Sequence, residues 1–499
     1  MFTDVIDTLV VGAALTPLVS YVGQAIHVRK LREAFAIAVF AVSGLLLYPL
    51  YAETGRSATV IVSALPPLGS CLEIDVLSVF MASLFIFLGL LSAVFSVRYM
   101  EHDTGLTAYY SVLLVMVAGM VGVVFAGDFF TLYIFWEIMS VASYALVAFR
   151  KERWEPVEAG FKYLIMSSAG SAMLLLGMSF LYGMTGTLNF AGLSKAMSGA
   201  FQGYDPWPLL TMVFIVTGFG VKAAIAPFHT WLPDAHPAAP SPVSSMLSGV
   251  VIKTGIYGLV RVLILIFAPF QAVWTVSLTV LAVATMFIGN LMALVQTDIK
   301  RLLAFSSIAQ IGYITFGLSL GTLSGVTGSL FHVMNHALMK GLLFMCAGAF
   351  LHATGTRDLN ELTGIGRRMP LTGLVFAVAA LAIMGVPTLN GFMSELYIIA
   401  AGVDARMYIP TGLMLVNIAI SVAYYLRVMQ ITLLRQPSEK LNGVKETPAS
   451  MLAPMVAIMV LLFVIGLYPQ PFLSFAQQAA QATMDTEGYI RPILGKVSP

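Results

Sequence analysis

Apolar runs of about twenty residues follow one another along almost the whole chain, and each is long enough to cross a bilayer core about 30 Å thick as a helix. We count about fourteen such runs between residues 5 and 476. Only 10% of the residues are charged, whereas soluble proteins have about a quarter. The sequence therefore predicts an all-α polytopic membrane protein and excludes an ordinary soluble domain.

The basic residues are unevenly distributed between the loops. They concentrate in alternate connections, at 30–32, 150–153, 300–301, 357–368 and 435–445. Cytoplasmic loops of membrane proteins carry an excess of Lys and Arg. We therefore predict a multi-pass protein of a prokaryotic-type cell inner membrane, with both termini on the outer face.

One apolar stretch, residues 217–261, combines charges with helix-breaking prolines. Its ionisable residues include Lys222, His229, Asp234, His236 and Lys253, and its prolines begin at Pro227. A charge at the bilayer centre costs about 2.5–3.5 kcal/mol or more, and proline interrupts a helix. Both are tolerated where a cavity or other helices receive them. The stretch therefore predicts a broken helix that belongs to an ion pathway, with His229 and His236 as relay groups.

Glu137 is the only acid at membrane depth in the predicted span 128–149. An unpaired carboxylate there would take up a proton, whereas a nearby cation would keep it ionised, and Lys222 is the candidate partner. One interpretation is a static buried ion pair. Such pairs seldom add stability over apolar packing, so we favour a proton-transfer pair.

His332, His336 and Lys340 recur every four residues and are predicted to share one helical face. Haem with two histidine ligands would normally take them from facing elements, and no second such helix is evident in the sequence. We therefore predict a titratable proton wire without a cofactor.

The sequence predicts no metal site. His229 and His236 have only Asp234 as a nearby acid. The two cysteines, Cys71 and Cys346, lie far apart and form neither a thiolate site nor a disulfide framework.

A second interrupted run covers 371–402, where GVPTLNG with Pro387 breaks the helix before Glu395. Two broken spans that lie five spans apart predict two five-helix repeats of opposite orientation. The expected parts are scaffold helices at 1–104, the first repeat at 105–267, the inverted second repeat at 268–435, and a last helix with a polar tail at 436–499. The outer loop with Glu73 is predicted to be scaffold.

Four long motifs occur in a characteristic order between residues 105 and 435. They are FWEIMSVASYALV, GVKAAIAPFHTWLPDAHPAAPSPVSSMLSG, DIKRLLAFSSIAQIGY and HVMNHALMKGLLFMCAG. Together they resemble the antiporter-like subunits of respiratory complex I, whose superfamily includes Mrp cation/proton antiporters and membrane-bound energy-converting hydrogenases.

The resemblance implies roles for individual residues. Glu137 and Lys222 would form the acid and base of one half-channel, and Lys253 would carry the proton toward the centre. His332, His336 and Lys340 would continue a hydrated axis, and Glu395 would be the terminal exchanging residue.

The resemblance also implies the setting of the chain. It would be a proton-translocating, non-catalytic subunit of a redox-driven complex, with other membrane subunits and a soluble redox arm as partners, the bilayer around it, and no nucleic acid. The chain stops soon after the last span, which leaves M- and N-type complex I subunits, hydrogenase subunits and D-type Mrp subunits. The last would move Na⁺ and H⁺ without redox coupling.

Overall fold

The structure is a computed structural model that describes residues 3–28, 30–54, 60–63, 71–200 and 205–494. In this part of the chain, thirteen helical segments are long and apolar enough to cross a membrane. They are α1 (Asp4–Ala25), α2 (Leu31–Thr54), α3 (Val76–Tyr99), α4 (Leu106–Phe125), α5 (Phe129–Val147), α6 (Trp154–Thr185), α8 (Pro206–Ala223), α10 to η2 (Ser241–Ile266), η3 with α12 (Ala268–Leu294), α13 (Ile299–Ser319), α14 (Leu323–Thr354), α18 with η4 (Tyr408–Leu434) and α19 (Ala449–Leu467).

The span predicted at 371–402 is interrupted, as the GVPTLNG motif indicates. It consists of α16 (Pro370–Ile383) and α17 (Asn390–Asp404), with Gly385 and Thr388 between them at positive φ. Together with the thirteen long segments, this pair accounts for the predicted number of spans, and the all-α polytopic fold is confirmed.

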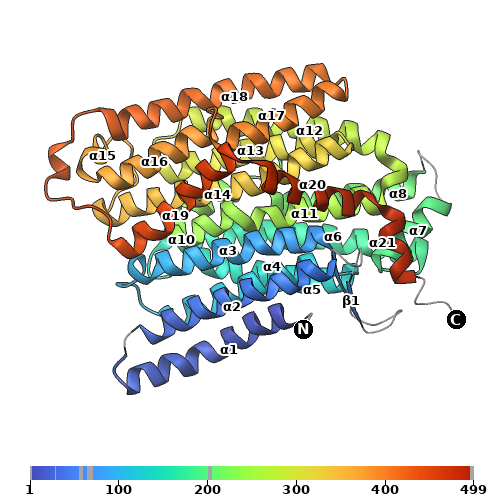
Figure 1. Cartoon of the computed structure of the whole chain (residues 1–499), viewed down its shortest axis with the longest axis horizontal. Helices are drawn as coiled ribbons and strands as arrows, with labels where there is room; N and C mark the ends of the chain where they lie inside the picture. Colours follow the sequence, from blue (N-terminus) through green and yellow to red (C-terminus); the bar gives the residue numbers. More distant parts are fainter. Residues whose placement is uncertain (1–2, 29, 55–59, 64–70, 201–204, 495–499) are drawn as a thin grey trace.

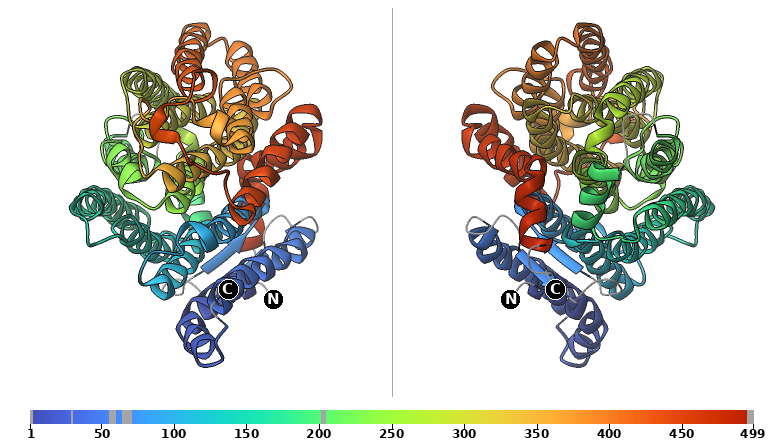
Figure 2. Two further views of the ribbon diagram at one scale, coloured as in Figure 1. Left: turned by 90° about the vertical axis from the view of Figure 1, so that its left-hand side faces the viewer. Right: turned by 90° about the vertical axis from the view of Figure 1, so that its right-hand side faces the viewer.

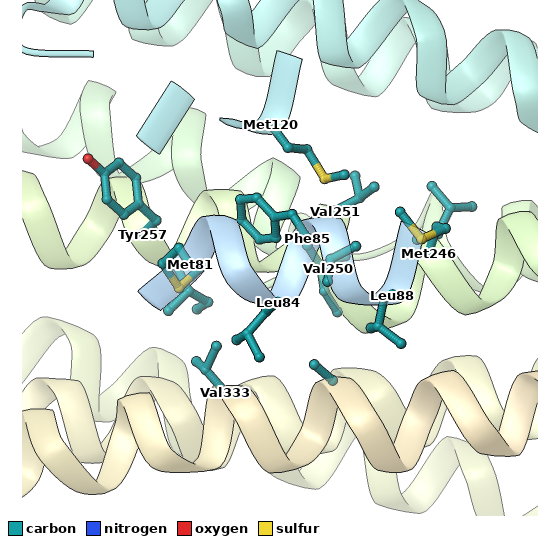
Figure 3. Packing of buried hydrophobic residues seen from close by; sticks show 14 of the residues in the cluster. Met81, Leu84, Phe85, Leu88, Met120, Met246, Val250, Val251, Tyr257 and Val333 are labelled. Atoms are coloured by element: carbon teal, nitrogen blue, oxygen red, sulfur yellow. The ribbon is translucent and has the colours of Figure 1, made fainter. Parts of the chain in front are cut away.

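The helices run side by side in one bundle (Figure 1). Viewed from its ends, the bundle has α1 and α2 at one edge and the helices of residues 268–435 at the opposite edge (Figure 2). Between these edges, α3 contributes Met81, Leu84, Phe85 and Leu88 to a packed apolar core (Figure 3). Val333 of α14 faces these α3 residues from a neighbouring helix (Figure 3). The scaffold helices are therefore joined to both halves of the bundle by apolar burial.

Ion pairs link the basic loops at one end of the bundle. Arg357 pairs with Glu155 at 2.8 Å, Arg150 with Asp103 at 2.8 Å, and Lys440 with Glu361 at 2.8 Å. We call this end the basic face. The start of α1 and the helix α21 (Thr486–Leu494) lie together at the opposite end (Figure 1).

The C-terminal segment departs from the predicted polar tail. The last span ends at Leu467, and α20 (Gln470–Met484) then lies against α3 and α14 before α21 begins. Tyr489 of α21 is buried and donates a short hydrogen bond to Glu73 of strand β2 (Cys71–Ile74), which pairs with β1 (Val60–Ser63). The loop and the tail therefore form a packed junction, because Glu73 can be buried once α21 supplies a donor.

The stability of this junction is predicted to fall as pH rises. Burial raises the pKa of the Glu73 carboxyl from about 4.5 to about 7. The folded state therefore binds more protons than the unfolded state, and the stabilisation present below pH 4.5 is lost as pH rises toward 7. We expect hydrogen exchange of α21, corrected for its intrinsic pH dependence, to be slower at pH 5 than at pH 8. Glu73→Gln should remove this difference, whereas Glu487→Gln on the exposed side of α21 should keep it. An unchanged pH dependence in Glu73→Gln would contradict the prediction.

Two long helices end in the same local motif. Both α6 and α14 have 32 residues. At their ends, Thr185 and Thr354 donate to the carbonyl four residues back, and Gly186 and Gly355 follow with φ of 70° and 75°. The two threonine hydroxyls also accept from the backbone N–H two residues later, at 3.4 and 3.3 Å. Residues 105–267 and 268–435 thus share a capping structure at corresponding places.

Candidate functional site

Four lysines lie inside the bundle with exposures of 1% or less. They are Lys222, Lys253, Lys300 and Lys340. Within the described residues their ammonium groups contact carbonyl and hydroxyl oxygens, and no carboxylate lies within ion-pair distance. Buried ammonium groups are costly unless they are paired or solvated, so this arrangement needs a functional explanation.

Lys222 lies at the last turn of α8, directly before the break predicted within residues 217–261. Its Nζ donates to Tyr163 Oη at 3.1 Å and to Ser167 Oγ at 3.2 Å. It also lies over the rings of Tyr163 and Trp136, 4.9 and 5.5 Å from their centroids. Aromatic faces attract a cation and compensate part of its lost hydration.

Glu137, the predicted partner of Lys222, follows Trp136 on α5. It is only partly buried, and its Oε1 has no hydrogen-bond partner among the described residues. No ion pair within 4.0 Å joins it to Lys222 in the described structure. The sequence predicted Glu137 as the partner of Lys222, whereas the direct partners of Lys222 in the described structure are hydroxyls.

The break that follows α8 separates the two histidines that the sequence grouped together. Chain direction changes at Ala224, with φ 57°, and helix resumes at α9 (Leu232–Ala238). Pro227 is exposed and His229 is partly buried, whereas His236 is fully buried. The His236 ring stacks on Phe344 of α14 with centroids 4.4 Å apart, and neither ring nitrogen has a partner in the described structure. Only His236 therefore reaches the interior.

Lys253 follows a π-helical turn. This turn, η1 (Leu247–Val251), precedes α11 (Ile252–Arg261), and the Lys253 ammonium donates a short hydrogen bond to the carbonyl of Ser248. Ser248 Oγ in turn lies 2.7 Å from Ser307 Oγ of α13. π-turns are uncommon and occur frequently at functional sites. Lys253 thereby connects the first half of the bundle to α13 in the second.

The row predicted on α14 consists of His332, His336 and Lys340. His332 and His336 stack with ring centroids 6.1 Å apart, and Lys340 donates to the Leu303 carbonyl and to Tyr425 Oη, each at 3.0 Å. Both His336 nitrogens lack a partner among the described residues. Buried polar atoms of this kind are normally satisfied by ordered water.

The α14 row ends at the second break, between α16 and α17. His332 Nδ1 lies 2.9 Å from Ser394 Oγ of α17, and the next residue, Glu395, is 4% exposed. A Cβ on Gly385 would lie 2.5 Å from Glu395 Oε2, so the carboxylate rests against the interruption itself. Pro387 lies exposed in the same interruption.

Gly385→Ala is predicted to destabilise the second break. The residue has φ 73°, and the added methyl would collide with the Glu395 carboxylate. Alanine at a position with positive φ costs about 1 kcal/mol or more. The thermal unfolding midpoint of the purified protein should fall. Gly183→Ala is the control, because a Cβ there meets nothing within 4 Å in the helix α6 and should be neutral or stabilising. Equal midpoints for the two variants would refute the prediction.

Several buried polar partners were missed by reading the sequence. They are Tyr163, Ser167, Gln310, Ser394 and Tyr425. A signal for the first two exists: Tyr163, Ser167 and Ser171 lie as far before Thr185 as His332, His336 and Lys340 lie before Thr354. Comparing residues 105–267 with residues 268–435 position by position would have revealed that α6 presents its own polar row.

Comparisons with known proteins show the family of the chain. Residues 126–421 match the family described as NADH:quinone oxidoreductase/Mrp antiporter, TM, and residues 68–110 match the N-terminus of chain 5 of NADH-ubiquinone oxidoreductase (complex I). NADH-quinone oxidoreductase subunit N of Desulforudis audaxviator is 36% identical over 434 residues, which cover 83% of this chain and 85% of that protein.

Two solved structures share the fold over nearly its full length. A chain of the membrane-bound sulfane sulfur reductase, an archaeal respiratory membrane complex, has a TM-score of 0.88 at 29% identity, with 98% of this chain and 99% of that chain covered. A chain of the Mrp complex from Dietzia sp. has a TM-score of 0.88 at 25% identity with the same coverage. The motifs, the two broken spans and these matches lead to one conclusion: the chain belongs to the NADH:quinone oxidoreductase/Mrp antiporter family of membrane subunits.

Proposed function

We propose that this chain is a proton-translocating, antiporter-like subunit of a redox-driven membrane complex. Its similarity to a subunit of NADH-quinone oxidoreductase and to a chain of an archaeal respiratory complex supports the redox coupling. Other membrane subunits and a soluble redox arm are its partners. The chain itself supplies the ion path and no redox centre.

One observation carries the proposal: lysines and imidazoles are buried within the bundle without carboxylate partners at ion-pair distance in the described residues. Lys253 bonds a carbonyl, and His236 and His336 present ring nitrogens that no protein atom satisfies there. Charged groups at membrane depth usually mark ion paths or proton relays. A static scaffold would be as stable with apolar side chains at these positions.

The mechanism that fits this row is electrostatic. A change of charge beside Glu137 alters the proton affinity of Lys222, and the released proton moves through Lys253 and the α14 row to Glu395. A change of one pKa unit corresponds to about 1.4 kcal/mol, so a few coupled groups transmit useful energy. Hydroxyls such as those of Tyr163 and Ser394 hold Lys222 and His332 in position, and the two breaks allow small local movements.

Orientation and repeat structure complete the proposal. The basic face is the cytoplasmic side of an inner membrane, and both termini lie on the outer side. The excess of Arg and Lys on the basic face supports this orientation. Residues 105–267 and 268–435 are the two inverted repeats. The matching helix ends at Thr185 and Thr354 support this division.

A second candidate is a D-type subunit of an Mrp antiporter. It rests on the similarity to a chain of the Dietzia Mrp complex. In that case the same residues exchange Na⁺ for H⁺ without an electron donor.

The test measures proton and sodium flux in inverted vesicles that contain the whole native complex. We expect electron-donor-dependent proton uptake to fall by about tenfold or more in Glu137→Ala, Lys222→Ala and Glu395→Gln, because each removes a proton-carrying group. Uptake that needs sodium and no electron donor would favour the antiporter. Wild-type uptake in all three variants, with only assembly affected, would refute proton translocation through these residues.

A further inference from the structure

Two cavities open on the basic face around the short helix α9. Their volumes are about 460 and 540 Å³, and both are lined by Glu155, Pro237 and Arg357. Their walls are rich in charged side chains from α6, α13 and the loop after α14. Cavities of this size and polarity hold water. They bring bulk water to the end of α9, next to the buried His236.

A buried cation lies directly behind the cavity wall. The Lys300 ammonium donates to the carbonyl of Ala239 at 2.6 Å and approaches that of Pro237 at 3.5 Å. Ala239 and Pro237 both line the smaller cavity, and Pro237 also lines the larger. Arg357 donates a short hydrogen bond to the same Pro237 carbonyl. Lys300 itself is 0% exposed.

Stability does not account for a lysine at this position. Lys300 is the second residue of α13, and a cation is disfavoured at a helix N-terminus. The adjacent acid, Asp298, accepts from the backbone N–H groups of Lys300 and Arg301 and pairs with Arg357 at 3.1 Å. Its carboxylate is therefore engaged elsewhere. What a buried lysine offers beyond an arginine is the ability to lose its proton.

The next titratable group inward is His236, adjacent in the chain to Pro237. Its ring is 0% exposed and stacks on Phe344, which is one helical turn beyond Lys340 on α14. Both of its nitrogens are without a partner in the described residues, so the imidazole is free to accept and donate a proton.

We propose that Lys300 is the group that transfers protons from the water of the two cavities to His236. The neutral Lys300 amine accepts a proton from hydronium in the cavity. The resulting ammonium gives that proton to an unprotonated nitrogen of His236, which passes it on toward Lys253 and Lys340. Lys300 returns to the neutral amine, so one proton crosses the wall per cycle and no other bond changes. This inference rests on the proposed proton translocation and adds its cytoplasmic inlet.

The test compares two variants that keep hydrogen-bond donors for the two carbonyls but cannot take up and release a proton. Lys300→Arg stays protonated, and Lys300→Gln is neutral. In inverted vesicles with the whole complex, we expect both to lower proton uptake per electron transferred by about tenfold or more with normal amounts of assembled complex. Lys151→Gln, an exposed lysine on the same face, is the control and should change uptake by less than about twofold.

Other outcomes separate this inference from the function on which it rests. Wild-type uptake in Lys300→Arg or Lys300→Gln, while Lys253→Met abolishes uptake in the same vesicles, would overturn the role of Lys300 alone. Loss of assembly in both variants would show that Lys300 only stabilises the position of α9, and this result would also overturn the proposed proton transfer. Unchanged uptake in Lys253→Met would instead refute the proposed proton translocation.

Discussion

Replacement of Lys253 by methionine is expected to lower proton uptake by the assembled complex by about tenfold or more without loss of assembly. Lys253 is 1% exposed and its ammonium bonds the Ser248 carbonyl, at the junction of the two halves. Methionine has nearly the same length and no charge. Replacing a buried ion by an apolar side chain is often neutral or stabilising, so the loss would concern transport and not folding.

Two further variants make the Lys253 result specific. Lys253→Arg keeps a cation but does not release a proton, so it should lose uptake as methionine does. Lys195→Met changes an exposed lysine of α7 (Phe190–Ala200) and should transport normally. If Lys253→Arg pumps like the wild type, Lys253 acts as a fixed charge and the relay through it is wrong. Proton uptake per electron and the amount of assembled complex are the quantities to measure.

Asp75→Ala is expected to destabilise the protein by about 3–5 kcal/mol, because it leaves the Arg261 guanidinium buried without its counter-ion. The two side chains are 1% and 2% exposed, and they form a bidentate contact of 2.6 and 2.9 Å. Asp75 also caps α3 by accepting from the Ser78 backbone N–H at 2.8 Å, so the variant loses this bond as well. The measurement is the thermal unfolding midpoint of the purified protein in detergent.

A double variant distinguishes the unpaired charge from simple loss of contacts. Asp75→Leu combined with Arg261→Met removes both charges and should recover most of the lost stability. The matched control is the exposed pair of Lys440 and Glu361, which are 2.8 Å apart, where Lys440→Ala should change the midpoint little because water screens both charges. If Asp75→Ala unfolds no earlier than Lys440→Ala, the buried pair is not a stabilising contact.

Local sequence patterns predicted the spans and their interruptions. Apolar length determines which segments cross a bilayer, and proline and glycine determine where such a helix must stop, so the breaks after Lys222 and before Glu395 were readable directly. The spacing of His332, His336 and Lys340 likewise predicted their row, because a helix places every fourth residue on nearly one face.

Only the tertiary structure decided which side chains meet. Lys222 contacts Tyr163 and Ser167 of α6 instead of pairing directly with Glu137, and His229 stays near the bundle surface while His236 enters it. These outcomes depend on the rotation of packed helices about their axes. Residues far apart in the chain set that rotation together, and no local pattern records it.

The same reason explains the features at the two ends of the molecule. Lys300 belongs to one of the basic connections in the sequence, yet α9 folds over it and makes it a buried cation beneath the cavities. Glu73 and Tyr489 stand 416 residues apart and become partners because α20 crosses the bundle and brings α21 to strand β2. The sequence by itself determined the membrane architecture and the set of titratable residues. Packing between distant helices decided which of them are buried and which side chains they contact.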